Sequence, residues 1–222
     1  MLAGKNEAPV RNWIKAMDLW QLGDAARTNE MKAIIRKELD GYTATADPPA
    51  SLMIPELMEM YPNAKVLCTV RDRTKWVESM LTMRKLIIPF PVATGLYFWI
   101  PSLRYMGRFW GQIPGVFERR YGEGISDMES GYRVYDKHHE LLENLVPKEK
   151  LFYVDVKDGW GPMCEALGVE VPKDVEFPRL NDSKDMEVLF KKFAQQGIAR
   201  WGMFFAGVSV VVAAAWMYWR GL

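Results

Sequence analysis

The feature that most constrains the fold of this 222-residue chain is an uninterrupted apolar segment near its C-terminal end. Residues 201–219 (WGMFFAGVSVVVAAAWMYW) contain no charged side chain in 19 positions. As a helix, a segment of that length is roughly 28 Å long, close to the thickness of the hydrocarbon core of a bilayer. Trp201 begins the segment and three aromatic residues close it, as interfacial belts require. The sequence therefore predicts a transmembrane tail anchor over residues 198–222.

Basic residues are distributed unequally on the two sides of this segment. Lys191, Lys192 and Arg200 precede it, and Arg220 alone follows it. Because cytoplasmic flanks carry an excess of Lys and Arg, this bias predicts a single-pass membrane protein with its main domain, residues 1–197, in the cytosol.

Composition excludes several kinds of partner. The chain has 29 basic and 28 acidic residues, and a net charge of +1 argues against nucleic acid as a partner. Cys68 and Cys164 cannot form a disulfide framework, which favours a reducing compartment. Since His138 and His139 are adjacent, no zinc-ligand spacing exists, and we expect no metal site.

A second hydrophobic segment, residues 86–117, contains no acidic residue and eight of the 28 aromatic residues. Four prolines interrupt it, which argues against a second transmembrane helix. Two interpretations stay open. The segment is either core packing or a hydrophobic lid, or it is a membrane-associated insertion that lies in the interface with Arg104 and Arg108 toward the headgroups.

The rest of the chain reads as strands alternating with helices, which predicts an α/β fold with a parallel sheet and flanking helices. Apolar residues recur at helical spacing over residues 9–40, 51–61 and 127–146. A fourth helix follows a cap at Thr74, and a fifth covers residues 159–167. The expected strands are residues 42–46 (YTATA), 64–70 (AKVLCTV) and 151–156 (LFYVDV).

Arg71 directly follows the 64–70 strand, and Ser79 lies eight residues later, about two turns along the next helix. In open α/β sheets, ligands bind at the carboxyl ends of the strands. A guanidinium group at a strand end and a nearby hydroxyl make a plausible phosphate clamp. Taken alone the pair is weak, because an Arg after a strand often makes only a surface ion pair.

Three motifs in this order resemble the P-loop sulfotransferase superfamily, and more narrowly its fungal and protist branch. They are YPNAKVLCTVRDRTKWVESM (residues 61–80), LFYVDVKDGWGPMCEALGVEVP (residues 151–172) and FPRLNDS (residues 177–183). The resemblance implies a P-loop NTPase-like, three-layer fold and the cofactor 3′-phosphoadenosine 5′-phosphosulfate. The sulfonate of this cofactor moves to an acceptor hydroxyl or amine.

The resemblance also assigns residues to the cofactor. Arg71 and Ser79 match the pair that holds the 3′-phosphate, and Tyr153 is a looser match to the tyrosine that approaches the adenine. Trp76 fits the branch pattern as a packing residue. Lys157, Gly159 and Trp160 fit the pattern too, without a role that we can assign.

The sequence departs from the family at its N-terminal side. Members begin with a strand and a Gly-rich loop that binds the 5′-phosphosulfate through backbone amides, and MLAGKNEA (residues 1–8) offers neither. The acceptor-activating base is not identified either, because His138 and His139 read as solvated helical residues. A shortened sequence is one explanation, and a degenerate family member is the other.

Two functions follow from these patterns. The first is a membrane-anchored sulfotransferase that acts on a small-molecule or lipid acceptor. The second is a catalytically inactive, membrane-tethered binding or scaffold protein that keeps the fold.

Overall fold

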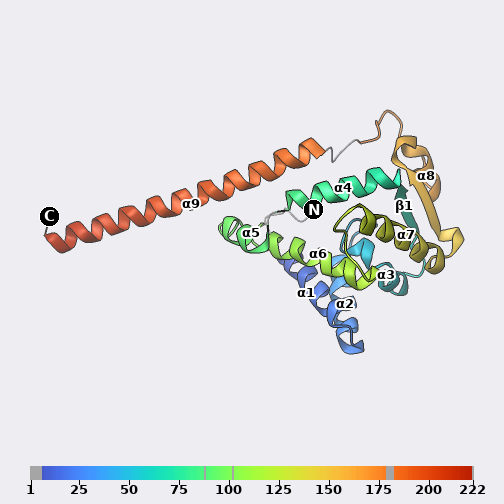
Figure 1. Ribbon diagram of the computed structural model, residues 1–222, viewed down its shortest axis with the longest axis horizontal. Coiled ribbons are helices and arrows are strands. Elements are labelled where there is room, and N and C mark those ends of the chain that lie inside the picture. Colours follow the sequence, from blue (N-terminus) through green and yellow to red (C-terminus); the bar gives the residue numbers. More distant parts are fainter. Residues whose placement is uncertain (1–6, 88, 102, 179–182, 222) are drawn as a thin grey trace.

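The computed structural model describes residues 7–87, 89–101, 103–178 and 183–221, and shows a mixed α/β body from which one long helix extends (Figure 1). The strands are β1 (Val66–Val70) and β2 (Leu151–Asp155), and the long helix is α9 (Ser183–Arg220). The other helices are α1 (Ala8–Leu22), α2 (Ala25–Glu38), α3 (Ile54–Met60), α4 (Arg73–Leu86), α5 (Phe90–Leu96), α6 (Met106–Tyr121), α7 (Met128–Leu145) and α8 (Trp160–Leu167). The described residues also include three single 3₁₀ turns: η1 (Ala50–Leu52), η2 (Lys148–Lys150) and η3 (Val156–Asp158).

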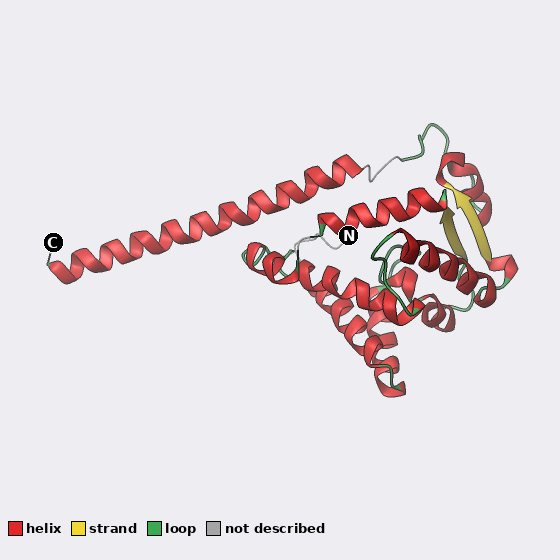
Figure 2. Ribbon diagram, in the orientation of Figure 1, coloured by secondary structure: helices red, strands yellow, loops and turns green. Residues whose placement is uncertain are grey.

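The two strands form a small parallel sheet at one end of the body (Figure 2). Val66 pairs with Leu151 and Val70 with Asp155, so the carboxyl ends of both strands meet at the same edge. One face of the sheet packs on α7, where Cys68, Leu142 and Val146 form a buried cluster. Two strands of the described part therefore match the prediction, and a three-layer sheet stays a prediction.

The prediction of a strand over residues 42–46 is wrong. These residues form a loop, and the side chain of Tyr42 is 52% exposed. The alternation of Tyr and Thr suits a strand locally. However, an isolated five-residue strand cannot satisfy its backbone hydrogen bonds without a neighbour, and no described strand lies beside it.

The main core is helical and lies between α1, α2 and α6. Met17, Met31, Phe109 and Val116 are each fully buried there. The predicted helical run over residues 9–40 divides into α1 and α2 at Gly23, whose φ of 74° is a left-handed conformation that glycine adopts without strain. Helix–helix packing, rather than a large sheet, therefore holds most of the body together.

Helix α6 places residues 106–117 of the hydrophobic segment 86–117 in or against this core. Phe109, Ile113 and Phe117 are buried, and Pro114 lies inside the helix rather than ending it. The guanidinium of Arg108 donates to the carboxylate of Asp18 at 2.8 Å. Arg108 therefore pairs with α1 and does not point toward lipid headgroups as the second interpretation expected. A position in the membrane interface stays a prediction only for α5 and the loop that follows it.

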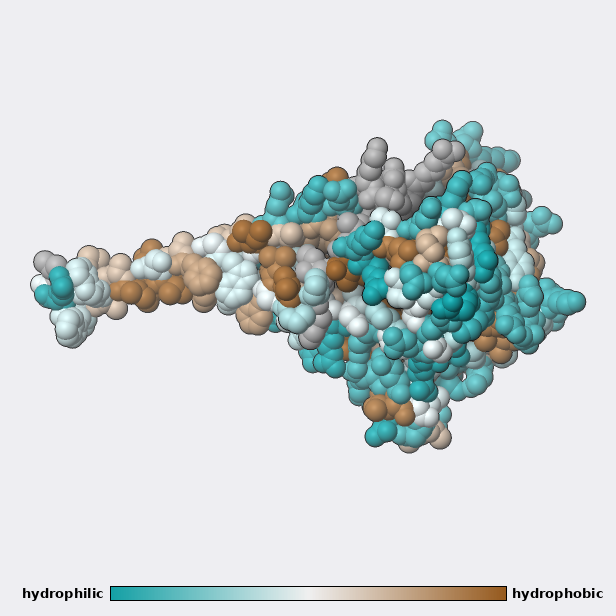
Figure 3. All heavy atoms as spheres, in the orientation of Figure 1, coloured by the Kyte–Doolittle hydropathy of each residue, from teal (hydrophilic) through white to brown (hydrophobic). Residues whose placement is uncertain are grey.

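Helix α9 is long and apolar enough to cross a membrane, and its apolar surface extends well beyond the body (Figure 3). Near the body it rests on α5. The indole nitrogen of Trp201 donates to the carbonyl of Gly95 at 2.8 Å, and Arg200 donates to the carbonyl of Trp99 at 2.8 Å. These two contacts fix where the apolar part of α9 begins relative to the body.

Helices α4 and α7 approach each other closely at Gly131. A Cβ atom at this position would overlap both methyl groups of Val77, which is itself fully buried. The start of α7 is fixed by Asp127, whose side chain accepts from the backbone N–H of Ser130 in a capping box. The absence of a side chain at Gly131 therefore sets the spacing of the two helices.

We predict that Gly131→Ala destabilises the protein by about 1–3 kcal/mol, because the added methyl group forces α4 and α7 apart in a packed core. The measurement is the free energy of unfolding of the full chain in detergent. Gly161→Ala is the matched control, since a Cβ atom there meets no atom within 4 Å. A Gly131→Ala protein as stable as the Gly161→Ala protein would contradict this account of the packing.

Candidate functional site

Arg71 lies at the carboxyl end of β1, in the two-residue turn before α4. Its side chain is exposed, and no ion pair or hydrogen bond engages its guanidinium group within the described residues. Its backbone carbonyl accepts a hydrogen bond from the hydroxyl of Tyr135 at 3.2 Å, which ties the turn to α7. The turn is thus held in place while the charged group stays available for an anion.

Ser79 lies in the second turn of α4, about 9 Å along the helix axis from Arg73. Its side chain is half-buried, and no hydrogen bond to its hydroxyl occurs in the part of the chain that the structure describes. Trp76, three residues earlier, lies on the same face of the helix. The two residues predicted to bind phosphate, Arg71 and Ser79, therefore lie in one β1–α4 unit. Neither side chain has a hydrogen-bond partner among the described residues.

The N-terminus of α4 is capped by Asp72, not by Thr74 as the sequence suggested. The Asp72 carboxylate accepts from the backbone N–H of Lys75 at 2.8 Å. The hydroxyl of Thr74 instead lies 3.2 Å from that of Tyr132. Because a carboxylate already occupies this end of the helix, an anion must be bound chiefly by side-chain cations such as Arg71.

A row of four aromatic rings, hereafter the aromatic row, connects α4, α7 and β2: Trp76, Tyr135, His139 and Tyr153. Successive ring centroids are 5.4, 4.5 and 5.7 Å apart. The imidazole of His139 stacks on Tyr153 with an interplanar angle of 17°. The row brings Tyr153 into the same region as Arg71, because Tyr135 contacts both His139 and the Arg71 carbonyl.

Tyr153 itself is 41% exposed, and its hydroxyl makes a long hydrogen bond of 3.4 Å to Glu143. It lies opposite Cys68 in the sheet register. Burial raises the pKa of the Cys68 thiol to about 11, so this cysteine is a protonated packing residue rather than a nucleophile. The exposed part of the Tyr153 ring is the surface on which a planar ligand could lie.

His138 is not the solvated residue that the sequence suggested. Its Nδ1 lies 2.7 Å from the hydroxyl of Tyr121, which is buried. Burial, with a smaller contribution from the neighbouring His139, lowers the pKa of His138 to about 4. Adjacent positions on a helix point about 100° apart, so one histidine faces the core while the other joins the aromatic row.

The other motif residues have structural roles or fall outside the described region. The indole nitrogen of Trp160 donates to the carbonyl of Val175 at 2.9 Å, and its ring packs edge-on against Phe177. The ammonium of Lys157 is 3.8 Å from the carboxylate of Asp155. Residues 179–182 of the third motif and residues 1–6 lie outside the described residues.

Sequence reasoning missed Tyr135, His139 and the capping residue Asp72. The sequence contains only part of the information needed to find these residues. Tyr135 and His139 are four residues apart on one helix face, but nothing in the sequence says that Tyr153 meets them. Asp72 is a favoured capping residue that the assignment to Thr74 passed over.

Comparison with known proteins now adds to this geometry. A family described as "Sulfotransferase domain" matches residues 2–186. The chain belongs to the sulfotransferase family. The matched range contains Arg71, Ser79, Tyr153 and the whole aromatic row, and it ends within the first turn of α9.

The chain is also similar to Ava biosynthesis cluster protein M of Aspergillus versicolor. The two are 30% identical over 146 residues, which is 64% of this chain and 55% of the relative. The chain therefore spans about half the length of that relative.

The Tyr121–His138 pair predicts a loss of stability in acid. An unfolded histidine has a pKa near 6.5, whereas that of the folded His138 is about 4. Between pH 6.5 and pH 4 the histidine is protonated in the unfolded state but not in the folded state. The stability that the neutral His138 contributes to the folded protein is therefore fully present above pH 6.5, and it is lost as the pH falls toward 4. We expect a decrease of about 1–2 kcal/mol in the free energy of unfolding between pH 7 and pH 5.

His138→Asn keeps a neutral polar partner for Tyr121 and should remove most of this pH dependence. His139→Asn is the matched control, and most of the dependence should persist in it. The two variants are compared by denaturant unfolding of the full chain at pH 7 and pH 5. Equal pH dependence in His138→Asn and the wild type would show that another group is responsible.

Proposed function

We propose that this sulfotransferase-family protein is anchored in a membrane by α9 and binds 3′-phosphoadenosine 5′-phosphosulfate at the carboxyl edge of its sheet. The observation that carries the proposal is family membership over residues 2–186, together with the free guanidinium group of Arg71 at that edge. In this proposal the body adopts a P-loop NTPase-like fold around the two described strands. The bound cofactor supplies the sulfonate group that is transferred to an acceptor hydroxyl or amine.

The residues present fit the 3′-phosphate and the adenine. Among the described residues the guanidinium group of Arg71 has no partner and can bind phosphate oxygens in a bidentate manner, and the hydroxyl of Ser79 has no hydrogen bond either. Tyr153 presents the exposed part of its ring for the adenine. The hydrogen bond from Tyr135 to the Arg71 carbonyl holds the turn, so little ordering of the backbone is needed when the nucleotide binds.

A second candidate function is a catalytically inactive, membrane-tethered binding or scaffold protein. It is favoured by one observation, the lack of a Gly-rich phosphate loop anywhere in the sequence. Such a loop stabilises the charge that develops on the leaving phosphate, and this kind of stabilisation is commonly the largest contribution to catalysis. The two candidates differ in nucleotide binding and in sulfonate transfer.

Adenosine 3′,5′-bisphosphate should bind the full chain in detergent, and Arg71→Ala should weaken binding by about 1.5–3 kcal/mol, the scale of a hydrogen bond to a charged group. Ser79→Ala should weaken it less, because a neutral hydroxyl contributes about 0.5–1.5 kcal/mol. Isothermal titration calorimetry measures all three affinities.

Arg84→Ala is the matched control for charge. Arg84 lies at the other end of α4 and donates to the carbonyl of Ile125. This variant should bind the nucleotide like the wild type. No binding to the wild type, or an equal loss in Arg71→Ala and Arg84→Ala, would exclude the proposed clamp, and transfer of radiolabelled sulfonate then separates an enzyme from an inactive binding protein.

A second exposed apolar segment lies beside α9. We define it as the collar, which consists of α5 (Phe90–Leu96) and the loop that follows it through Arg104. Val92 and Phe98 of the collar are 59% and 43% exposed, and Phe98 lies in an aromatic cluster with Trp99 and Trp201. The collar thus continues the apolar surface of α9 at the level where Trp201 enters it, and we propose that it lies in the membrane interface.

The collar makes a testable contribution to membrane binding. A chain that ends at residue 197 should still pellet with phosphatidylcholine vesicles, because the exposed apolar side chains of the collar remain. Val92→Asp with Phe98→Asp should move most of this shortened protein to the supernatant. Leu22→Asp, which alters an equally exposed apolar residue far from the collar, should have little effect. A shortened chain that stays fully in the supernatant would exclude the interfacial collar.

A further inference from the structure

Two arginines are held side by side at the point where α9 leaves the body: Arg104 of the collar and Arg200 of α9. The Nε of Arg104 donates to the carbonyl of Phe98 at 2.8 Å, and the Nη1 of Arg200 donates to the carbonyl of Trp99 at 2.8 Å. Successive residues are about 3.8 Å apart along the backbone, so both guanidinium groups are attached to one short stretch of the collar. We define these two side chains as the arginine pair.

The charge of the arginine pair is not neutralised within the described residues. Neither guanidinium group has a carboxylate partner there, whereas the neighbouring Arg108 is paired with Asp18 at 2.8 Å. The sequence has no acidic residue over residues 79–117 or 188–222, which contain the collar and the apolar part of α9. A carbonyl orients a guanidinium group without cancelling its charge, and most of the N–H donors of each arginine stay free. The pair is therefore suited to an anion.

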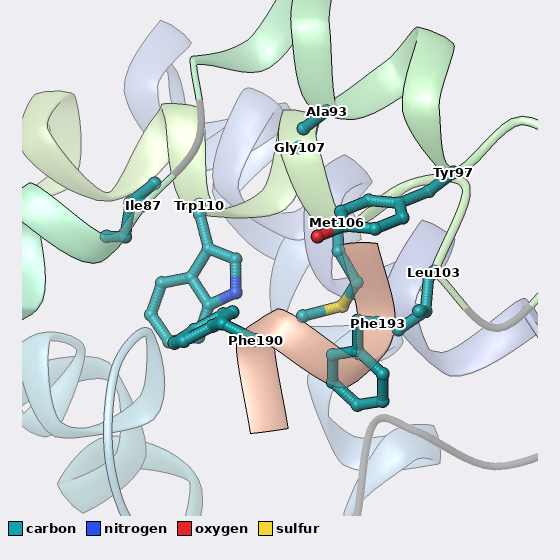
Figure 4. A pocket seen from close by; sticks show the side chains of 9 residues that line it. All are labelled: Ile87, Ala93, Tyr97, Leu103, Met106, Gly107, Trp110, Phe190 and Phe193. Carbon is teal, nitrogen blue, oxygen red and sulfur yellow. The ribbon is translucent and has the colours of Figure 1, made fainter. Parts of the chain in front are cut away.

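Close packing of α9 on α5 brings Arg200 to the collar. A Cβ atom at Gly197 would lie 2.5 Å from the carbonyl oxygen of Leu96, so the contact leaves no room for a side chain there. Before this crossing, Phe190 and Phe193 of α9 line a small cavity between α9 and the body (Figure 4). Arg200 lies about one turn beyond Gly197, so its position follows from the packing of the helix.

The arginine pair lies at the level where the apolar part of α9 begins. Trp201 is the first residue of the uncharged segment 201–219, and its ring centroid is 6.4 Å from that of Phe98 and 5.7 Å from that of Trp99. Aromatic clusters at the ends of spanning helices lie at the depth of the lipid headgroups, and arginines at such ends extend toward the same depth. If α9 spans a bilayer as proposed above, the pair therefore lies among lipid phosphates.

We propose that the arginine pair binds the phosphate of an anionic phospholipid at the membrane surface. A guanidinium group matches two oxygens of a phosphate, which makes arginine better suited to this ligand than lysine. Two cations without a carboxylate favour a lipid of net negative charge over a zwitterionic lipid, whose own cation competes for the phosphate. The lipid joins the collar to α9, because it contacts one arginine on each. This inference rests on the proposed membrane anchor and is independent of nucleotide binding.

Native mass spectrometry of the full chain tests the proposal. The protein is released from nanodiscs that contain equal amounts of phosphatidylglycerol and phosphatidylcholine, and the lipids that stay bound are counted. The wild type should retain phosphatidylglycerol in preference to phosphatidylcholine. Arg104→Ala and Arg200→Ala should each reduce the retained phosphatidylglycerol about five- to tenfold, because each removes a hydrogen bond between charged groups.

Arg119→Ala is the matched control. Arg119 also donates to a backbone carbonyl, that of Gln21, and lies over the ring of Trp20, but it is near the other end of α6 from Arg104. This variant should retain phosphatidylglycerol like the wild type. Equal retention by all the variants and the wild type, or no preference for phosphatidylglycerol in the wild type, would overturn the proposal.

A second measurement separates lipid binding from a defect in folding. Phosphatidylglycerol added to protein in lipid-free detergent should raise the unfolding temperature of the wild type and of Arg119→Ala, and should raise that of Arg104→Ala and Arg200→Ala less. Each protein is compared with itself, so a lower basal stability does not imitate this result. An equal rise in all four proteins would contradict the proposal.

Two further outcomes identify the source of the phosphate and the status of the anchor. An excess of inorganic phosphate should leave phosphatidylglycerol bound, and its displacement would assign the arginine pair to free phosphate and overturn the lipid site. Failure of the chain to enter nanodiscs would overturn both the lipid site and the membrane anchor. Loss of the lipid preference in protein that has entered nanodiscs would overturn the lipid site alone.

Discussion

The arrangement of the body depends on the close contact between α7 and its two neighbours. Gly131 lets α7 pack directly on Val77 of α4, while Leu142, further along the same helix, packs on Cys68 of the sheet. Because α4 and β1 are joined by only two residues, this double contact also fixes the turn that carries Arg71. The hydroxyl of Tyr135 adds a hydrogen bond to that turn. The candidate site is therefore built by helix packing as much as by the sheet.

The sequence predicts helices and strands well where the pattern of apolar residues within the segment is enough to determine its structure. The apolar, β-branched runs at β1 and β2 and the amphipathic spacing of α7 give their positions within one or two residues. The failures arise where the outcome depends on neighbours. YTATA has strand propensity but no described strand to pair with, and Pro114 lies within α6 because core contacts of Phe109 and Phe117 compensate for the lost hydrogen bond.

The candidate site was predictable in its parts but not in its assembly. Arg71 and Ser79 follow from one strand and the next helix, so local spacing places them. The aromatic row joins three elements that are distant in sequence, and no spacing rule connects Tyr153 to His139. The different environments of the adjacent residues His138 and His139 also depend on contacts between elements that are distant in sequence. Which face of α7 meets Tyr121 is decided by the packing of α6, and periodicity within α7 does not contain that information.

The geometry also constrains how donor and acceptor could meet in the proposed enzyme. The collar and Trp201 lie near the C-terminal end of α4, and the clamp residue Arg71 precedes its N-terminal end, about 20 Å away along the helix. If α9 lies in the bilayer as proposed, the proposed nucleotide site is on the part of the body remote from the hydrocarbon core. A soluble cofactor reaches such a site without crossing lipid. A lipid acceptor would need a headgroup that extends well above the membrane, whereas a small soluble acceptor meets no such limit.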